Sequence, residues 1–507
     1  MRLCDLYLAL LVVAGVLFAL WVGSLRRLPK PPGPRGLPLL GNVFDIPSGR
    51  TWEGFARMGE RYGPLISLSL GPVTMVIANT YNVAHDILDK KSQIYSDRPY
   101  LALAELVGWD LTTALLPYGP KLKRTRQMFH AELGTKPVVK GFHAQLNAQA
   151  RTFLILLRDE PQKLLEHCHY HAGAFILRVV HGYKAEIQHD KFITQAEIAM
   201  GEFNEGLEPG RYLVNILPFL RHLPEWVPGT AFFRNARRYR ENLNNLMLPP
   251  VQLVQEQLKR NEAEESFMSK WLKRCSADDD VELIMYGAGS LLAAGAETTA
   301  ITLHCFFLMM IQNPDIQERL QEELESACGR SRLPTFEDRE QLPYLGAVIK
   351  EVHRIHPPAP LGVPHSTTQD DVHNGYFIPK GSLVFPNVWN MSRDSSMYPN
   401  PFKFNPERFM GPDPQRDPTD YIFGFGRRLC PGQLIVDASI FITTAMCLHA
   451  YTFRPSLDEH RNPIFPALEP QAASATSNIK PYNFVIVPRY TKDEFEEFLN
   501  VKSINNV

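Results

Sequence analysis

The apolar and polar positions divide the chain into an N-terminal apolar run and a long patterned body. Residues 6–23 are uncharged and apolar, which is just long enough for one helix to span a bilayer. A helix-like segment and two strand-like runs, LISLSL and TMVIA, occupy about 51–90. The pattern is mostly helical from about 120 to 345, and short strands such as SLVFPNVW are expected between about 359 and 410. These periods predict a mainly α protein with a smaller β portion in one large domain.

Two apolar segments of the second half are expected to be long helices. Residues 433–450 form one, and the strand-like NFVIVP follows later in the chain. Residues 283–311 are apolar enough for a second membrane span, but Glu297 at their midpoint would cost about 2.5–3.5 kcal/mol in a bilayer. We therefore expect a central helix buried in a soluble core. A carboxylate inside such a helix requires a functional reason.

The N-terminal run predicts a membrane anchor with the body of the protein in the cytosol. Arg26, Arg27 and Lys30 follow it, and basic flanks stay on the cytosolic side. A cleaved signal peptide is the alternative, but its basic residues should precede the apolar run and a small-x-small site should follow. The proline-rich stretch LPKPPGPRGLPLLGN predicts a stiff spacer. The expected division is an anchor at 1–27, a hinge at 28–42 and one domain at 43–507.

Composition excludes several classes of function. The 53 Lys and Arg residues balance 54 Asp and Glu residues, so no basic field favours nucleic acid as a partner. The seven cysteines are widely spaced and form no CxxC pair, which argues against a disulfide framework and for a reducing compartment. No GxGxxG motif follows a strand and no phosphate-binding loop is present, so the chain is not expected to bind a nicotinamide or flavin itself.

One cysteine lies in an unusual setting, the stretch FGFGRRLCPG at 423–432. A helix N-terminus stabilises a thiolate, and Pro431 suits the first position of the helix that follows. Glycine at 424, 426 and 432 lets the backbone approach something flat, and Arg428 suits carboxylates on that object. These features point to a haem held through the Cys430 sulfur. Taken alone, the stretch fits a buried structural cysteine beside a glycine turn equally well.

Three further motifs favour the haem interpretation. AGAETT (294–299), EVHR (351–354) and PERF (406–409) precede FGFGRRLCPG in this order. With them, essentially the whole chain resembles the cytochrome P-450 superfamily of haem-thiolate monooxygenases. The sequence is most similar to microsomal members of this superfamily that act in fungal secondary metabolism. The resemblance implies the cytochrome P-450 fold, a catalytic domain at 43–507 and haem b as the cofactor.

The resemblance also implies roles for individual residues. Cys430 would be the axial ligand of the haem iron, beside Phe423, Gly424, Gly426 and Gly432. Arg428, Lys123, Arg126 and His365 would contact haem propionates. Ala294 would leave room for dioxygen, while Glu297 and Thr298 deliver protons. Glu351, Arg354 and Arg408 would form a structural pairing of one carboxylate with two guanidinium groups.

The sequence departs from the family at YGPKLKRTR (118–126). Leu122 replaces the family's tryptophan and Lys123 replaces an arginine. A lysine offers a point charge instead of a planar fork, so its propionate contact is weakened. His365 has its own alternative, an ordinary histidine in a surface loop.

Partners and substrate follow from the resemblance as well. Microsomal members are single-pass proteins of the endoplasmic reticulum membrane that receive electrons from an NADPH–cytochrome reductase. The segments expected to contact substrate lie at 100–117, 291–298, 359–364 and 470–478 and carry few charges. A lipophilic, terpenoid-like substrate for oxygen insertion from O2 fits them, and an aromatic or indolic compound fits nearly as well. An isomerase that needs no dioxygen and a haem carrier without turnover are the rival functions.

Two short segments give further expectations. EHCHYHAG (166–173) places His167 and His171 four residues apart. No second ligand pair is nearby, so exposed helical histidines are expected there in preference to a zinc site. LPEWVPGTAFF (223–233) is expected to expose Trp226, Phe232 and Phe233 beside the basic RNARRYR and to contact the membrane interface. A loop packed between helices is its alternative.

Overall fold

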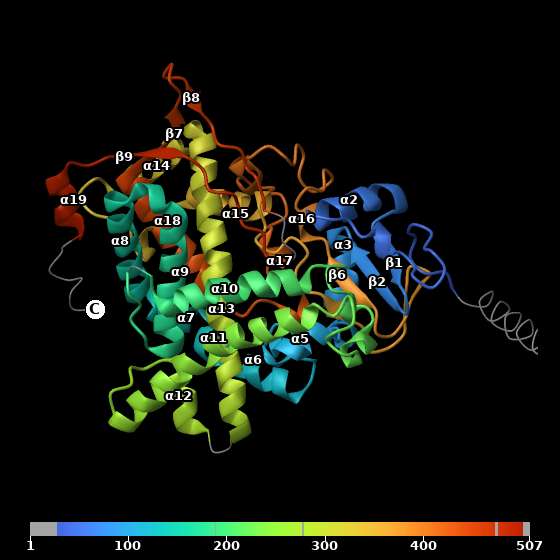
Figure 1. Cartoon of the computed structure of the whole chain (residues 1–507). Coiled ribbons are helices and arrows are strands. Elements are labelled where there is room, and N and C mark those ends of the chain that lie inside the picture. The colour runs from blue at the N-terminus through green and yellow to red at the C-terminus, as the bar shows by residue number, and fades with distance from the viewer. Residues whose placement is uncertain (1–27, 188, 276–277, 472–474, 500–507) are drawn as a thin grey trace, which may run out of the picture.

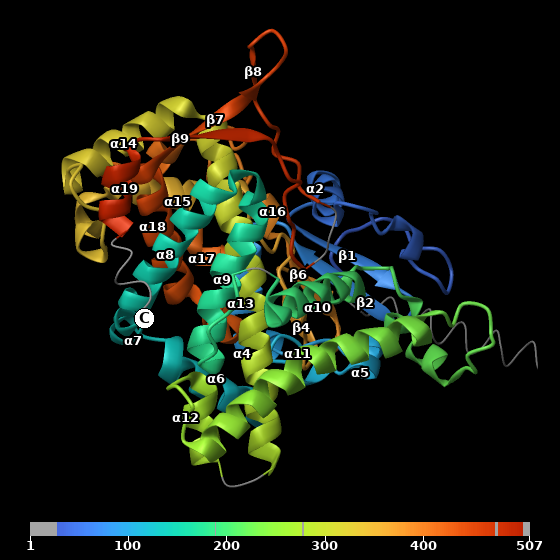
Figure 2. The same cartoon turned by 60° about the vertical axis from the view of Figure 1, so that its left-hand side comes forward.

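The computed structural model describes residues 28–187, 189–275, 278–471 and 475–499. The expected anchor at 1–27 lies outside the described residues. A long helix, α13 (Asp278–Gln312), runs through the middle of the molecule and other helices surround it (Figure 1). Strands β1, β2 and β6 lie together at one side, away from α8, α14 and α18 (Figures 1 and 2).

Most of the described chain is helical, as the periodicity predicted. The α-helices before α13 are α2 (Thr51–Tyr62), α3 (Tyr81–Ala84), α4 (Ser92–Tyr95), α5 (Ala102–Val107), α6 (Pro120–Leu133), α7 (Lys136–Gly141), α8 (His143–Asp159), α9 (Leu164–His181), α10 (Lys191–Leu207), α11 (Phe232–Arg260) and α12 (Phe267–Arg274). Those after it are α14 (Pro314–Cys328), α15 (Pro343–Ile355), α16 (Val388–Met391), α17 (Thr419–Ile422), α18 (Gln433–Ala450) and α19 (Lys492–Leu499).

The strands form small sheets from segments distant in sequence. They are β1 (Leu65–Leu70), β2 (Val73–Ala78), β3 (His365–Ser366), β4 (Asp371–His373), β5 (Tyr376–Ile378), β6 (Leu383–Pro386), β7 (Tyr451–Leu457), β8 (Pro463–Ile464) and β9 (Phe484–Pro488). One sheet has the order β1-β2-β6-β3, in which β2 and β6 run parallel with Met75 opposite Leu383. A second sheet has the order β8-β7-β9, and β4 pairs with β5. The first sheet thus ties the N-terminal part of the chain to the segment after α15.

Helix α13 is a core helix, as expected for 283–311. Its apolar 18-residue window is 83% buried, and that of α18 is 78% buried, although both are long and apolar enough to cross a membrane. Leu292, Phe306 and Ile311 are fully buried within the described core. Because α9, α10, α11, α12 and α18 all pack against α13, its apolar residues are needed on every side.

The proline-rich stretch 28–42 packs on the body, so the expected spacer is not free-standing where the structure describes it. The Ser67 amide of β1 donates to the Pro32 carbonyl at 2.8 Å, and the Ser67 hydroxyl donates to Pro31 at 2.5 Å. Gly41 forms an isolated bridge with Leu70. Proline lacks an N–H but keeps its carbonyl, so this stretch accepts hydrogen bonds from the edge strand.

The expected strand SLVFPNVW is correct only in its first half. Strand β6 ends at Pro386, and α16 begins at Val388. The side chain of Asn387 accepts a hydrogen bond from the Asn390 amide. This capping bond satisfies a free N–H and starts a helix where apolar alternation alone predicts a strand.

Candidate active site

Cys430 lies in the short loop between a 3-10 turn (Gly426–Arg428) and α18. Its amide donates to the Phe423 carbonyl at 2.8 Å, which closes the loop. Helix α18 begins at Gln433, so Pro431 does not occupy its first position as predicted. Burial raises the pKa of the Cys430 thiol, and the amides of Gly432 and Gln433 and the charge of Arg126 oppose this rise. The helix terminus thus acts in the predicted direction, but burial is the larger effect.

The glycines of this loop serve different purposes. Gly424 has φ +88° and Gly426 has φ +51°, conformations that disfavour other residues. A Cβ on Gly426 would lie 2.7 Å from the Leu88 carbonyl oxygen and from Cβ of Ser92. The backbone at Gly426 therefore packs closely against other parts of the protein, whether or not it also faces a group bound at Cys430. A Cβ on Gly432 would lie 3.8 Å from the Cys430 sulfur, an ordinary contact distance, so the sulfur itself does not require glycine at 432.

Three arginines gather near the Cys430 loop, and we call Arg98, Arg126 and Arg428 the guanidinium cluster. Each donates to backbone carbonyls. Arg428 Nε donates to Ser96 at 2.7 Å, and Arg126 donates to Leu429 at 2.7 Å. The other bonds of the cluster are those of Arg428 to Leu116 and Thr113 and those of Arg98 to Ala114, Val363 and Pro364. Carbonyl acceptors fix the three side chains but leave their charges uncompensated.

The electrostatics of the guanidinium cluster fit a dianionic ligand. Burial lowers the pKa of all three groups, to about 10 for Arg428, and the charges of Arg428 and Arg126 lower the pKa of Arg98 further. Asp97 opposes the shifts of Arg98 and Arg428. Among the described residues, none of the three arginines has an ion pair within 4.0 Å. Two haem propionates would supply the missing negative charge, so the residues present fit a haem bound at Cys430.

Lys123 lies at the protein surface. It is exposed, and its ammonium lies 5.3 Å from the centre of the Tyr118 ring. Arg427 also lies over this ring, at 5.2 Å, and donates to the Tyr118 hydroxyl. Leu122, in place of the family's tryptophan, is buried. All these residues border one open pocket of about 620 Å³ that Arg126 also lines.

His365 is buried in β3, so the surface-loop alternative is wrong. Its Nδ1 lies 2.7 Å from the Tyr95 carbonyl, which can only accept, so Nδ1 carries the proton. Burial and the charge of Arg98 hold its pKa well below the usual range. A neutral ring with a proton on Nδ1 has none on Nε2. His365 would donate to a propionate through Nε2 only after the carboxylate had drawn a second proton onto the ring.

Helix α13 presents an open turn in an otherwise buried stretch. Ala294 is exposed, whereas Leu292, Ala293 and Ala296 are buried. The Thr298 hydroxyl donates to the Ala294 carbonyl at 2.9 Å, which joins the two ends of this turn. Neither side chain is charged or large, so this part of α13 leaves its surface open to a small molecule.

Glu297 is buried next to this turn and is held by groups outside the helix. Its Oε1 accepts from the Asn478 side chain at 2.7 Å, and its Oε2 lies 4.0 Å from Nδ1 of His169 on α9. The side chain is only 7% exposed and lines a polar cavity. A carboxylate inside α13 was expected to have a functional role. The contacts of Glu297 connect that role with α9 and the C-terminal loop.

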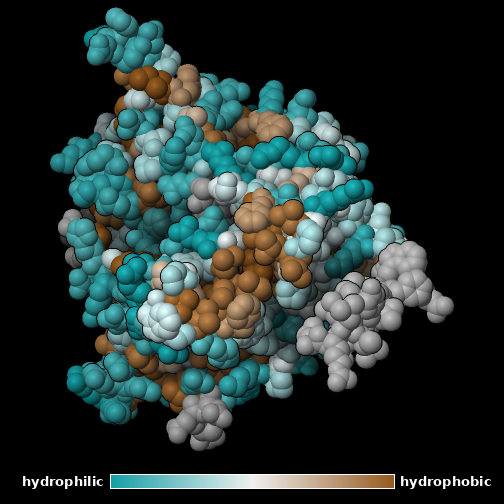
Figure 3. All heavy atoms as spheres, turned by 45° about the vertical axis from the view of Figure 1, so that its right-hand side comes forward, coloured by the Kyte–Doolittle hydropathy of each residue, from teal (hydrophilic) through white to brown (hydrophobic). Residues whose placement is uncertain are grey.

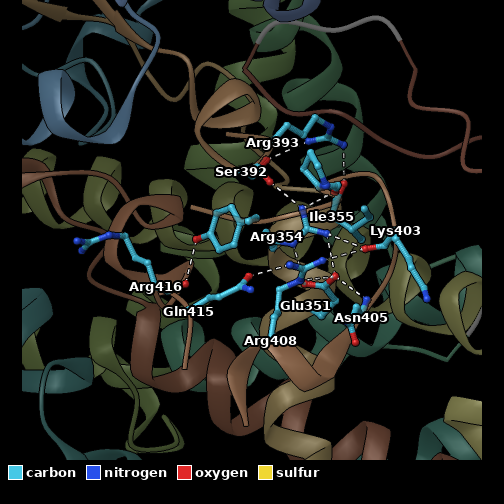
Figure 4. A network of polar contacts seen from close by, with 12 residues as sticks. Glu351, Arg354, Ile355, Ser392, Arg393, Lys403, Asn405, Arg408, Gln415 and Arg416 are labelled. Carbon is cyan, nitrogen blue, oxygen red and sulfur yellow. Dashed lines mark hydrogen bonds and ion pairs between the residues drawn. The ribbon is translucent and has the colours of Figure 1, made fainter. Parts of the chain in front are cut away.

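Glu351, Arg354 and Arg408 form a buried network (Figure 4). Glu351 accepts two bonds from Arg354, at 2.7 and 2.8 Å, one from Arg408 at 3.1 Å and one from the Asn405 amide at 2.7 Å. Arg354 also donates to the carbonyls of Ser392, Pro401 and Lys403. The network ties α15 to the PERF turn and to the segment between them. The Cys430 loop comes after the PERF turn in the chain.

Two segments differ from expectation. His167 and His171 are buried, where exposed side chains were expected: His167 bonds the Glu160 carbonyl and His171 lies between Ser439 and Thr443. In 223–233, Trp226 is 82% exposed, but Phe232 is buried, and its ring centre lies 4.3 Å from that of the partly buried Phe233, with the rings tilted by 34°. The apolar face of an amphipathic helix, α11, explains the burial of Phe232.

Sequence reasoning missed Arg98, His169 and Asn478. Arg98 lies in SDRPY, next to a proline and without a charged partner in the sequence pattern. His169 stands between His167 and His171, and only the fold shows that it faces α13 and not α8. Asn478 lies more than 180 residues from Glu297, and no local pattern connects them.

Comparison with known proteins agrees with this geometry. The family model for cytochrome P450 matches residues 31–482. The chain belongs to the cytochrome P450 family. It is 39% identical to the cytochrome P450 monooxygenase claR of Ampulloclitocybe clavipes, over 95% of this chain and 91% of that protein. It is 39% identical to cytochrome P450 monooxygenase 208 of Postia placenta, over 97% and 96%. An O-methylsterigmatocystin oxidoreductase of Aspergillus flavus is 32% identical over 88% of both chains. As a cytochrome P450, the protein is a monooxygenase that uses haem iron.

Proposed function

We propose that this cytochrome P450 inserts one oxygen atom from O2 into a lipophilic secondary metabolite. The observation that carries this proposal is the open turn on α13, where the exposed Ala294 and the partly buried Thr298 are small and uncharged, in the same molecule as the Cys430 loop. The bound haem supplies oxygen activation at its iron. The protein's own residues then have to hold that group, exclude charged molecules and deliver protons.

We assign these tasks to named residues. Cys430 would ligate the iron, and the guanidinium cluster would hold the propionates, with His365 and Lys123 as neighbours at the edge. Phe423, Gly424, Gly426 and Gly432 would shape the loop beneath the haem. Thr298 would position a water molecule near Ala294, and Glu297 would supply its proton. Glu351, Arg354 and Arg408 would keep the loop in place without touching the substrate.

A terpenoid-like substrate is supported by the apolar residues near α5 and α10. A pocket of about 10 Å³ there, which must widen before such a substrate enters, is lined mainly by Leu103, Val107, Trp109, Leu115, Phe203 and Leu207. A polycyclic aromatic substrate is the second candidate. The aromatic rings of Trp109 and Phe203 beside this pocket favour it, since aromatic groups pack well against one another.

We further propose that the protein lies on the endoplasmic reticulum membrane and takes electrons from an NADPH–cytochrome reductase. One face carries a large apolar patch (Figure 3). Two segments supply exposed apolar side chains near each other: a Cβ on Gly71 would lie 3.7 Å from the Leu39 carbonyl oxygen and 4.0 Å from Cδ2 of Leu217, and a Cβ on Gly210 would lie 3.1 Å from Cδ1 of Ile46. The exposed members are Leu37, Leu39, Leu40, Phe44, Leu213, Phe219 and Trp226. We call them the apolar face, and such a mixture of Trp, Phe and Leu suits a bilayer interface.

The decisive experiment measures product with purified reductase, NADPH and ¹⁸O-labelled O2 against a panel of terpenoid and polycyclic aromatic compounds. We expect one labelled oxygen per product molecule and a thiolate-type Soret band with carbon monoxide. Cys430→Ala is the control and should lose both the band and the product. An unlabelled product, or a thiolate band in the Cys430→Ala protein, would overturn the proposal.

A further inference from the structure

A polar cavity of about 410 Å³ lies on the side of α13 that carries Glu297. Its wall combines α9, α10, α13 and the C-terminal loop. The lining residues are His169, Glu197, Gly201, Asn204, Glu205, Glu208, Arg211, Glu297, Gln471 and Asn478. Most of them are polar or charged, so the cavity holds water and not a lipophilic substrate.

Exposure falls steadily from the cavity mouth to α13. The side chains of Arg211 and Glu197 are 47% and 42% exposed, His169 is 14% exposed and Glu297 is 7% exposed. Glu197 is therefore the most exposed of the three side chains and Glu297 the least exposed, although all three line the cavity. This order gives the cavity an outer and an inner end.

His169 stands between the two carboxylates. Its Nδ1 lies 3.5 Å from Oε1 of Glu197 and 4.0 Å from Oε2 of Glu297. Nδ1 is buried and has no hydrogen-bond partner among the described residues. Both distances exceed a direct hydrogen bond by about 1 Å, which is too little for a water molecule to fit between, so a small ring rotation is enough to bring Nδ1 within reach of either carboxylate. A buried imidazole nitrogen without a partner requires an explanation.

We propose that this cavity is the route by which protons reach the oxygen-activating side of α13, with His169 as the relay between Glu197 and Glu297. The inference rests on the proposed function. A proton from cavity water binds Glu197, moves to Nδ1 of His169 and passes to Oε2 of Glu297. Glu297 then gives it to the water held at the Thr298 hydroxyl, and each group returns to its starting protonation state. No electron moves in these steps.

The surrounding charges suit this task. Burial raises the pKa of Glu197, His169 opposes the rise, and Glu297 and Glu166 add to it. Glu197 therefore exchanges protons closer to neutral pH than an ordinary carboxyl group. Asn478 holds Oε1 of Glu297 and leaves Oε2 toward the ring. The other titratable groups around the ring are Glu166 on α9, Glu205 on α10, Glu208 and Arg211 beyond it, and His304 on α13.

A metal site is the competing use of such residues, and the geometry does not favour it. The described residues contain no group of three or more His, Cys, Asp or Glu side chains arranged to hold a metal ion. A relay needs only consecutive pairs, and the pairs Glu197–His169 and His169–Glu297 are present.

The test compares His169→Gln with Glu208→Gln in the holoenzyme. Gln fills the space of His169 but cannot carry a proton. Glu208 borders the same cavity and pairs with Arg211 at 3.3 Å, outside the relay. With reductase, NADPH and the substrate found in the labelling experiment, we expect kcat of His169→Gln to fall about 10-fold or more with KM unchanged. Its solvent isotope effect in D2O should rise, and Glu208→Gln should stay within about 2-fold of wild type.

A second readout does not depend on turnover. Infrared titration of the carboxyl C=O band of purified holoenzyme should place the Glu197 transition at higher pH in His169→Gln than in wild type, because a neighbouring cation is lost. Glu197→Gln should remove that transition. Wild-type kcat and isotope effect in His169→Gln, or no change in the titration, would overturn the relay. Absence of labelled product from the wild type would instead overturn the proposed function.

Discussion

Removing the carboxylate of Glu351 should destabilise the protein far more than removing an exposed carboxylate nearby. Glu351 and Arg354 are fully buried, and the side chain of Arg408 is 1% exposed. Glu351→Ala leaves four donors without their acceptor and two buried guanidinium groups without a counter-charge. Breaking a buried pair by removing one partner costs about 3–5 kcal/mol. We expect a loss of this size in the free energy of unfolding.

The matched control lies in the PERF turn, next to Arg408. Glu407 pairs with Arg319, but the two side chains are 49% and 52% exposed. A solvent-exposed pair contributes below about 1 kcal/mol, so Glu407→Ala should be nearly neutral. Glu351→Gln separates charge from volume: it keeps the shape and one carbonyl oxygen, so any loss it shows comes from the missing charge and acceptor.

Urea unfolding of the purified holoenzymes, followed by tryptophan fluorescence, measures these differences. Haem absorbance recorded in the same samples shows whether the Cys430 loop detaches before the rest of the molecule unfolds. A Glu351→Ala protein no less stable than Glu407→Ala would refute the reasoning, since it would mean that the buried guanidinium groups need no carboxylate.

Two further predictions concern turnover and membrane binding. Thr298→Ala should keep haem and NADPH use but lower the ratio of product to NADPH about 10-fold or more, with hydrogen peroxide in place of product. The control is Thr302→Ala, since the Thr302 hydroxyl donates to the Thr298 carbonyl at 3.0 Å. An unchanged ratio of product to NADPH in Thr298→Ala would contradict the proposed role of Thr298. A protein lacking residues 1–27 should still bind anionic liposomes. In that protein, the double substitution Trp226→Ser and Leu39→Ser should weaken binding severalfold, whereas Phe402→Ser, at an exposed position outside the apolar face, should leave it unchanged. Equal binding by the truncated protein, the double variant and the Phe402→Ser variant would show that the apolar face does not contact the membrane.

Local pattern was sufficient for the elements and for the motif residues. The helical stretch at 120–345, the burial of 283–311 and the strands LISLSL and TMVIA follow from periods of 3.6 and 2 and are confirmed. Pro431 and the segment after Pro386 were misjudged because caps and turns, not apolar spacing, decide where a helix starts. These errors are of a few residues and leave the elements themselves intact.

Contacts between distant segments were out of reach. The charge of Arg428 acts on Arg98 from a distant part of the chain, and Asn478 bonds Glu297 across 181 positions. No spacing rule connects such pairs. His167 and His171 were misplaced for the same reason: a histidine on a helix is exposed or buried according to which neighbour packs on it, and α8 and α18 cover these two. Burial of Phe232 likewise depends on where α11 rests.

The guanidinium cluster has a consequence for how much of this protein a cell can accumulate. Three neighbouring cations held by carbonyls repel one another, so the folded chain gains stability when a dianion joins them. A ligand that binds only the folded state adds about 2.7 kcal/mol at 100 times its Kd. Synthesis without enough haem would leave a larger unfolded fraction for proteases to remove. We therefore expect the yield of this enzyme to depend on porphyrin supply as well as on transcription and translation.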